Sequence, residues 1–87
     1  MLSLRDCLDY CDLTEDDVWL LAEHEHLPPE MAAHIACALA QTTEGVQILG
    51  HIMQDLIDRA ESAGAADRAQ HVRHVCARFQ AAHPLAH

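Results

Sequence analysis

Apolar residues recur along this chain at the three- and four-residue spacing of α-helices. The clearest stripe lies in residues 44–63 and comprises Val46, Leu49, Ile52, Met53, Leu56, Ile57 and Ala60. A second stripe, in residues 66–82, comprises Ala69, Val72, Val75, Cys76 and Phe79. Because polar side chains such as Asp55 and Asp58 lie opposite the first stripe, these segments predict two long helices, each with one buried face.

The first half of the chain predicts three shorter helices. The apolar positions that we expect to be buried are Leu4, Cys7, Leu8 and Cys11 in the first, Val18, Leu21 and Ala22 in the second, and Met31, Ile35, Ala38 and Leu39 in the third. The second helix also carries Trp19 and Leu20 on other faces. A helix that is apolar on several sides is either central to its fold or part of an interface.

Capping and helix-breaking residues place the ends of these helices. The residues expected to open them are Ser3 with Asp6, Thr14 with Asp17, Pro29, and the pair Thr42-Thr43. The helices are then expected to end near Cys11, His26, Ala40 or Gln41, Gly64 and Ala82. The first two openings resemble capping boxes, and Pro28 must terminate the second helix.

The pattern predicts an all-α fold, a compact antiparallel bundle of four to five helices in which the last two are longest. Strand-forming aromatic residues are scarce, with one Trp, one Tyr and one Phe in the whole chain. Connections this short favour antiparallel packing of sequence neighbours. Eighty-seven residues suffice for a single domain, residues 1–87.

Charge narrows the classes of partner. The formal net charge is −9, and residues 1–30 contain nine carboxylates against Arg5 alone. Such a field repels phosphates and anionic lipids, so we expect neither nucleic acid nor membrane as a partner. It attracts cations or the basic surface of another protein.

The N-terminal apolar stretch is interrupted by Arg5, Asp6 and Asp9, and is not typical of a signal peptide. The longest apolar run, residues 35–40, is too short to span a bilayer. We therefore predict a cytoplasmic protein whose four cysteines are reduced thiols.

The run Glu23-His24-Glu25-His26 gathers imidazole and carboxylate groups in one helical turn. Glu23 and His26 share a helix face, and a Glu-x-x-His pair is half of the ligand set of carboxylate-bridged metal bundles. If the Pro28-Pro29 turn folds the third helix back, Glu30 and His34 approach the same point. The ligands of this predicted Zn²⁺- or Fe²⁺-type site are Glu23, His24, His26, Glu30 and His34. A solvated, charged helix end is the alternative interpretation.

The cysteines suggest a second metal chemistry. Cys7 and Cys11 lie four residues apart, and Cys76 belongs to the last apolar stripe. Cys-x-x-x-Cys pairs in a helical bundle resemble those of bacterial copper storage proteins, which implies Cu(I) bound by Cys7, Cys11 and Cys76 as a less favoured alternative. Buried cysteines also serve simply as small hydrophobic side chains. A heme is not expected, because an alanine-rich core suits a large flat cofactor poorly.

Residues 66–82 carry a polar stripe that consists of Arg68, His71, His74 and Arg78. It is interpreted as a mixed solvated face, as a cationic stripe facing the acidic first thirty residues, or as a metal-binding histidine pair, which the arginines disfavour. His83 and His87 belong to a terminal tail that we expect to fray.

No catalytic constellation is apparent in the sequence. His34 and Cys37 are three residues apart, and an imidazole can activate a thiol. No third orienting group, oxyanion hole or glycine-rich phosphate loop accompanies them. We therefore expect no enzymatic activity.

The segments CLDYCDLT (residues 7–14) and AEHEH (residues 22–26) resemble a signature of small uncharacterised bacterial α-helical proteins. The resemblance implies a helical fold and no particular activity. Two functions remain open. One is metal binding through the five residues named above. The other is a protein-interaction module or small regulatory subunit, in which the acidic N-terminal surface and an exposed Trp19 or Leu20 dock a basic partner or support self-association.

Overall fold

The computed structural model describes residues 4–84, and within that range every regular element is an α-helix. The helices are α1 (Leu4–Tyr10), α2 (Glu15–Glu25), α3 (Pro29–Ala40), α4 (Thr43–Ser62) and α5 (Ala66–Ala82). The prediction of an all-α fold with the last two helices longest is confirmed. The expected Ser3–Asp6 cap lies outside the described residues.

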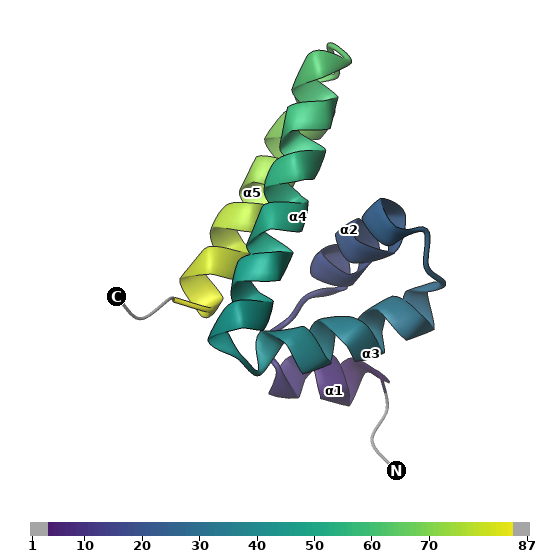
Figure 1. Ribbon diagram of the computed structural model, residues 1–87, viewed down its shortest axis with the longest axis vertical. Coiled ribbons are helices and arrows are strands. Elements are labelled where there is room, and N and C mark those ends of the chain that lie inside the picture. Colours follow the sequence, from purple (N-terminus) through teal and green to yellow (C-terminus); the bar gives the residue numbers. More distant parts are fainter. Residues whose placement is uncertain (1–3, 85–87) are drawn as a thin grey trace.

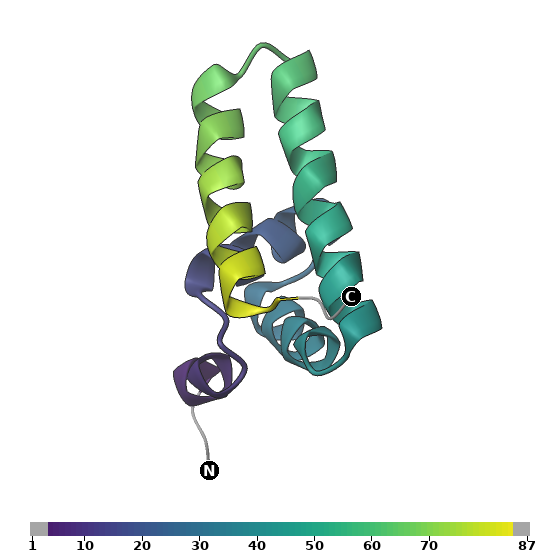
Figure 2. The same ribbon diagram turned by 90° about the vertical axis from the view of Figure 1, so that its left-hand side faces the viewer.

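The α4–α5 hairpin runs along the long axis of the molecule, α2 and α3 pack against it, and α1 lies on the far side of α3 (Figures 1 and 2). The tip of the hairpin, near Gly64, extends beyond the other helices, so the molecule measures 43 × 33 × 17 Å. α3 runs across the base of α4, and α2 contacts α3, α4 and α5. α1 packs mainly on α3.

The two long helices bury the faces that their sequences predict. The largest fully buried side chains of the hairpin are Leu49, Met53, Val72, Val75 and Phe79. Thr42 caps α4 by accepting a hydrogen bond from the Gly45 amide at 2.9 Å. Burial of each such side chain is worth about 1.5–3 kcal/mol, so this hairpin holds much of the hydrophobic core.

The buried face of α3 is made of alanine: Ala32, Ala33 and Ala36 are completely buried. Our assignment of Met31, Ile35 and Ala38 to the core was wrong, since all three are exposed. Small side chains allow α3 to approach its neighbours closely. At the end of α3 the approach is so close that a Cβ at Gly45 would overlap the backbone of Leu39. Periodicity places apolar residues on a face, but it does not reveal that alanine, and not the larger residues, meets the neighbouring helices.

The capping box that opens α2 forms as its sequence predicts. The Thr14 hydroxyl accepts from the Asp17 amide, and the Asp17 carboxylate accepts from the Thr14 amide at 2.9 Å. Asp17 is only 3 % exposed, which its sequence position did not predict. Leu20 is buried, so the expectation that it is exposed was wrong, whereas Trp19 is 59 % exposed.

Candidate functional site

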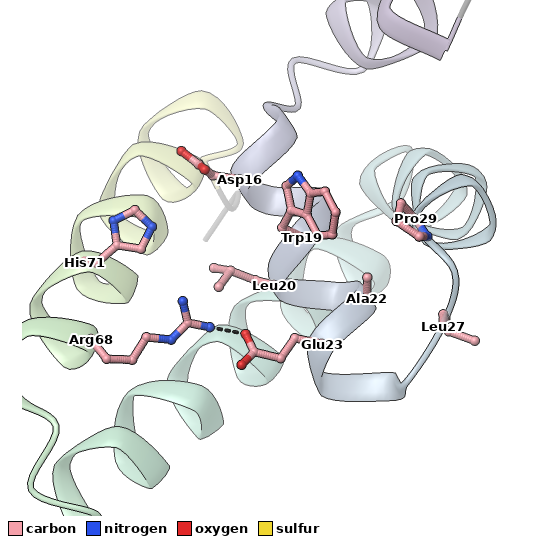
Figure 3. Close-up of a pocket in the computed structure, with 9 residues that line it drawn as sticks. All are labelled: Asp16, Trp19, Leu20, Ala22, Glu23, Leu27, Pro29, Arg68 and His71. Carbon is pink, nitrogen blue, oxygen red and sulfur yellow. Dashed lines mark hydrogen bonds and ion pairs between the residues drawn. The ribbon is translucent and has the colours of Figure 1, made fainter.

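Two of the five predicted metal ligands have partners elsewhere in the chain. Glu23 forms an ion pair with Arg68 of α5, and Figure 3 shows its side chain directed toward that helix. The His24 ring lies between two carboxylates, with Nε2 2.8 Å from Asp55 of α4 and Nδ1 2.9 Å from Glu25.

The other three predicted ligands are exposed. His26 forms the left-handed C-cap of α2 with a φ of 56°, and Glu30 and His34 lie on the outer surface of α3. Within residues 4–84, no group of three or more His, Cys, Asp or Glu side chains is arranged to hold a metal ion. The predicted site is therefore not preformed in the described structure, and metal binding there stays a prediction.

The polar stripe of α5 faces the acidic segment through its two arginines. Arg68 pairs with Glu23, and Arg78 lies 3.2 Å from Asp16. These contacts favour the interpretation of a cationic stripe that faces the first thirty residues. Of the N-terminal carboxylates in the described part of the chain, those that are exposed and make no ion pair are Asp9, Asp12, Glu15 and Glu30.

The indole of Trp19 lies between two hollows in the surface. One, of about 420 Å³, lies between α2 and α5 and is bounded by Leu20, Glu23 and Arg68 (Figure 3). The other, of about 480 Å³, lies between α1 and α2 beside the start of α3. Both volumes fall in the range of small-ligand sites, about 300–1,000 Å³, and both hollows open to solvent.

We call the apolar residues that line these hollows the Trp19 surface, which consists of Leu8, Val18, Trp19, Leu20, Ala22, Leu27 and Pro29. Only one of the two hollows is bordered by α5, while Trp19 and Pro29 line both. Glu15 and Arg5 stand at the rim of the second hollow. The chain thus presents its single tryptophan to solvent on a partly apolar, hollowed surface, which is the informative kind of exposure.

The four thiols are free and fall into two locations. Cys76 is buried in the core, where burial and then the nearby Asp17 charge raise the pKa of its thiol. Cys7, Cys11 and Cys37 are half-buried and gather where α1 meets α3. Cys37, and not the Cys76 that was grouped with them as a Cu(I) ligand, is the third thiol near Cys7 and Cys11, because pairing of α1 with α3 could not be read from spacing. Copper binding stays a prediction.

Cys37 is not an activated nucleophile in this structure. Burial, followed by the neighbouring Cys11 and Cys7 thiols, raises its pKa to about 12. A catalytic thiol requires the opposite shift, toward the thiolate at neutral pH. The adjacent histidine on the same helix, His34, is exposed and does not offset the burial.

His83 connects the end of α5 to the rest of the molecule through side-chain contacts. Its ring stacks on Phe79 with the centroids 4.6 Å apart, and Nε2 lies 2.8 Å from the Cys11 carbonyl oxygen. The expectation of a fraying tail was wrong for His83, because these contacts join the end of α5 to the α1–α2 connection. His87 lies outside the described residues.

Asp17 is the buried titratable group of this region. Burial raises the pKa of its carboxyl, and the opposing contributions of Thr14, Arg78 and His83 are smaller. Its Oδ1 atom is buried and has no hydrogen-bond partner. The α2 cap therefore includes an acid whose charged form is poorly solvated.

Comparison of the chain with protein-family models, with curated proteins and with solved structures finds no match. The resemblance of residues 7–14 and 22–26 to small bacterial helical proteins accordingly stays a prediction. None of the helices in residues 4–84 has the length and apolar character needed to cross a membrane.

Proposed function

We propose that this chain is a protein-interaction module that binds a basic segment of a partner protein across the Trp19 surface. The single observation that carries the proposal is the exposure of the only tryptophan, at 59 %, between two hollows. Tryptophan is among the residues that contribute most to binding energy at protein interfaces. Burying an indole against a partner releases a large apolar area and leaves its N–H available for a hydrogen bond.

The hollows give the partner places to insert side chains on both sides of the indole. Leu8 and Val18 form the apolar wall of one hollow, and Leu20 and Leu27 contribute to the other. A partner segment with two bulky aliphatic side chains would fill both and enclose Trp19 between them. Such enclosure excludes water from the centre of the contact, where interface residues contribute most.

The charge of the surroundings supports a basic partner. The chain carries a net charge of −9, and Glu15 stands beside Trp19 without an ion pair among the described residues. Arg68 and Arg78 are already paired with Glu23 and Asp16. Arg5 adds one positive charge at the rim. A net negative surface steers a cationic partner and opposes association of two copies of this chain.

The single tryptophan makes the proposal directly measurable. A synthetic amphipathic peptide that lacks tryptophan and carries arginine beside two leucines is titrated while Trp19 fluorescence is recorded. We expect a shift of the emission to shorter wavelength, weaker binding at high salt and no effect of a chelator. A matched peptide with glutamate in place of arginine should bind at least tenfold more weakly.

Variants locate the contact. Trp19→Ala, measured by calorimetry, should lower affinity at least tenfold, since hot-spot truncations cost about 2 kcal/mol or more. Tyr10→Ala is the matched control, because Tyr10 is an exposed aromatic residue on α1 that lines neither hollow. Equal binding by wild type and Trp19→Ala, or binding that requires a metal ion and ignores salt, would contradict the proposal.

A further inference from the structure

Three thiols meet where α1 packs on α3, and two of them make reciprocal contacts across the helix pair. The Cys37 Sγ atom lies 3.5 Å from the Cys7 carbonyl oxygen. The Cys11 Sγ atom lies 3.9 Å from the Cys37 carbonyl oxygen. Cys37 of α3 and Cys11, which directly follows α1, each direct a thiol onto a backbone carbonyl of the other segment.

The Cys7 carbonyl oxygen is a shared hydrogen-bond acceptor for Cys11 and Cys37. It accepts one hydrogen bond from the Cys11 amide at 3.1 Å and another from the Cys37 thiol. The Cys11 side chain lies against the Cys37 carbonyl group, and the Cys11 and Cys37 thiols are in side-chain contact with each other. Contact between the two sulfur atoms is the starting geometry from which a disulfide forms.

We propose that Cys11 and Cys37 are an oxidisable dithiol, which a hydroperoxide converts to an intramolecular disulfide that links α1 to α3. This inference does not depend on the proposed function. The overall change removes two electrons and two protons from the thiols and reduces one hydroperoxide to an alcohol and water. With hydrogen peroxide, two molecules of water are formed.

The two thiols have different roles in this reaction. Because the Cys37 thiol holds its proton, with its pKa raised to about 12, the first oxidation occurs at Cys11. The peroxide transfers one oxygen to the Cys11 sulfur, which becomes a sulfenic acid. Cys37 then attacks that sulfur, and the sulfenic hydroxyl leaves as water with the Cys37 proton. Oxidation should accordingly be slow at neutral pH and faster in alkali.

The disulfide would fix the least anchored helix of the molecule. α1 has seven residues, too few for a stable isolated helix, and packs mainly on α3. Closing the segment between Cys11 and Cys37 lowers the entropy of the unfolded chain. We expect the thermal midpoint of the oxidised protein to exceed that of the reduced protein by roughly 10 °C.

Disulfide mapping tests the proposal. The reduced protein is treated with hydrogen peroxide, the remaining thiols are capped with N-ethylmaleimide, and fragments are identified by mass spectrometry. Trypsin is unsuitable, because no lysine or arginine lies between Arg5 and Arg59 and all three thiols stay in one fragment. A protease that cleaves before aspartate separates Cys7 from Cys11 at Asp9.

The expected result is a Cys11–Cys37 link with a raised midpoint in wild type, in Cys7→Ser and in Cys76→Ser, and no link in Cys11→Ser or Cys37→Ser. Three results would overturn the proposal: a link that uses Cys7, a link between two chains, or oxidation to sulfinic acid without any link. If a serine variant does not fold, disulfide mapping of the wild-type protein still shows which cysteine is linked to Cys37, since Cys7 and Cys11 are released in different fragments.

Discussion

The α4–α5 hairpin and the three N-terminal helices are built from different side chains. The hairpin buries Leu49, Met53 and Phe79 along its interface and exposes mostly polar groups. In the N-terminal half, α3 buries alanines while Trp19 and Met31 remain exposed. That half also contains the buried acid Asp17 and the three gathered thiols.

We infer from this difference that the hairpin supplies most of the stability and that the N-terminal helices carry the groups available for binding. Large aliphatic and aromatic side chains in the hairpin bury apolar area, which is the dominant favourable term in folding. Small side chains and caps attach the N-terminal helices at close range, and they leave larger apolar groups available to a partner. We therefore expect substitutions in the hairpin to affect mainly stability and those near Trp19 to affect mainly binding.

The largest effect should follow removal of the hairpin's aromatic side chain. Phe79→Ala creates a cavity beside Val72 and Val75 and removes the stacking partner of His83. We expect a loss of about 3–5 kcal/mol in unfolding free energy, which would unfold much of a small domain. Urea unfolding followed by circular dichroism measures it. Ile48→Ala, on the exposed face of α4, should cost far less; similar losses in the two variants would refute the assignment of the core.

Two glycines of α4 test how closely α3 approaches α4. An added Cβ at Gly45 would overlap the Leu39 backbone, whereas one at Gly50 meets nothing within 4 Å. Gly45→Ala should destabilise by about 1–3 kcal/mol, because backbone cannot move aside as a flexible side chain can. Gly50→Ala should stabilise by about 0.5–1 kcal/mol through helix propensity. Equal effects of the same sign would show that α3 does not approach α4 this closely.

Asp17 should make stability depend on pH in a defined direction. Burial raises its pKa above the ordinary value of 3.8, so the fold favours the protonated acid. The stabilisation from the protonated Asp17 carboxyl is complete below pH 3.8, the pKa in the unfolded chain. It is lost as the pH rises through the raised pKa of the folded protein. Asp17→Asn, which keeps an oxygen for the Thr14 amide, should therefore exceed wild type in stability at pH 7, and the gain should shrink in acid.

Thermal unfolding between pH 3 and pH 7 measures this difference. The control is Asp9→Asn, since Asp9 is an exposed residue of α1. This substitution should change stability by less than about 0.5 kcal/mol over the whole pH range. A lower stability of Asp17→Asn at pH 7 would mean that the charged capping box outweighs burial, contrary to the direction given above.

The smallest effect concerns the ion pairs. Arg68–Glu23 joins α5 to α2, while Arg73–Glu61 lies within the hairpin. Both pairs are largely exposed, so Arg68→Ala and Arg73→Ala should each cost about 1 kcal/mol or less, and high salt should diminish the loss. A loss from Arg68→Ala that persists in high salt would assign the side chain a packing role between the two regions.

Much of the fold could be predicted because its signals are local. Helix ends depend on Thr14, Pro29, Thr42 and Gly64, which act on the backbone within one turn. The stripes of α4 and α5 were assigned correctly, since a long amphipathic helix has only one large apolar face. The candidate site was predicted less well. The predicted metal ligands are Glu23, His24, His26, Glu30 and His34, and metal binding by them stays a prediction. The spacing did not reveal that Glu23 lies against Arg68 and His24 against Asp55.

The amino-acid sequence alone determined the helical class, the five segments and the acidic character of the first thirty residues. Propensity, capping and net charge are properties of short stretches, and they do not require knowledge of neighbours in space. Only the tertiary structure decided that alanines of α3 face the core, that Asp17 is buried, that Cys37 lies near Cys7 and Cys11, and that Trp19 lies between two hollows. These outcomes depend on which helices meet and how closely, because close packing and not local preference selects the side chains that fit between them.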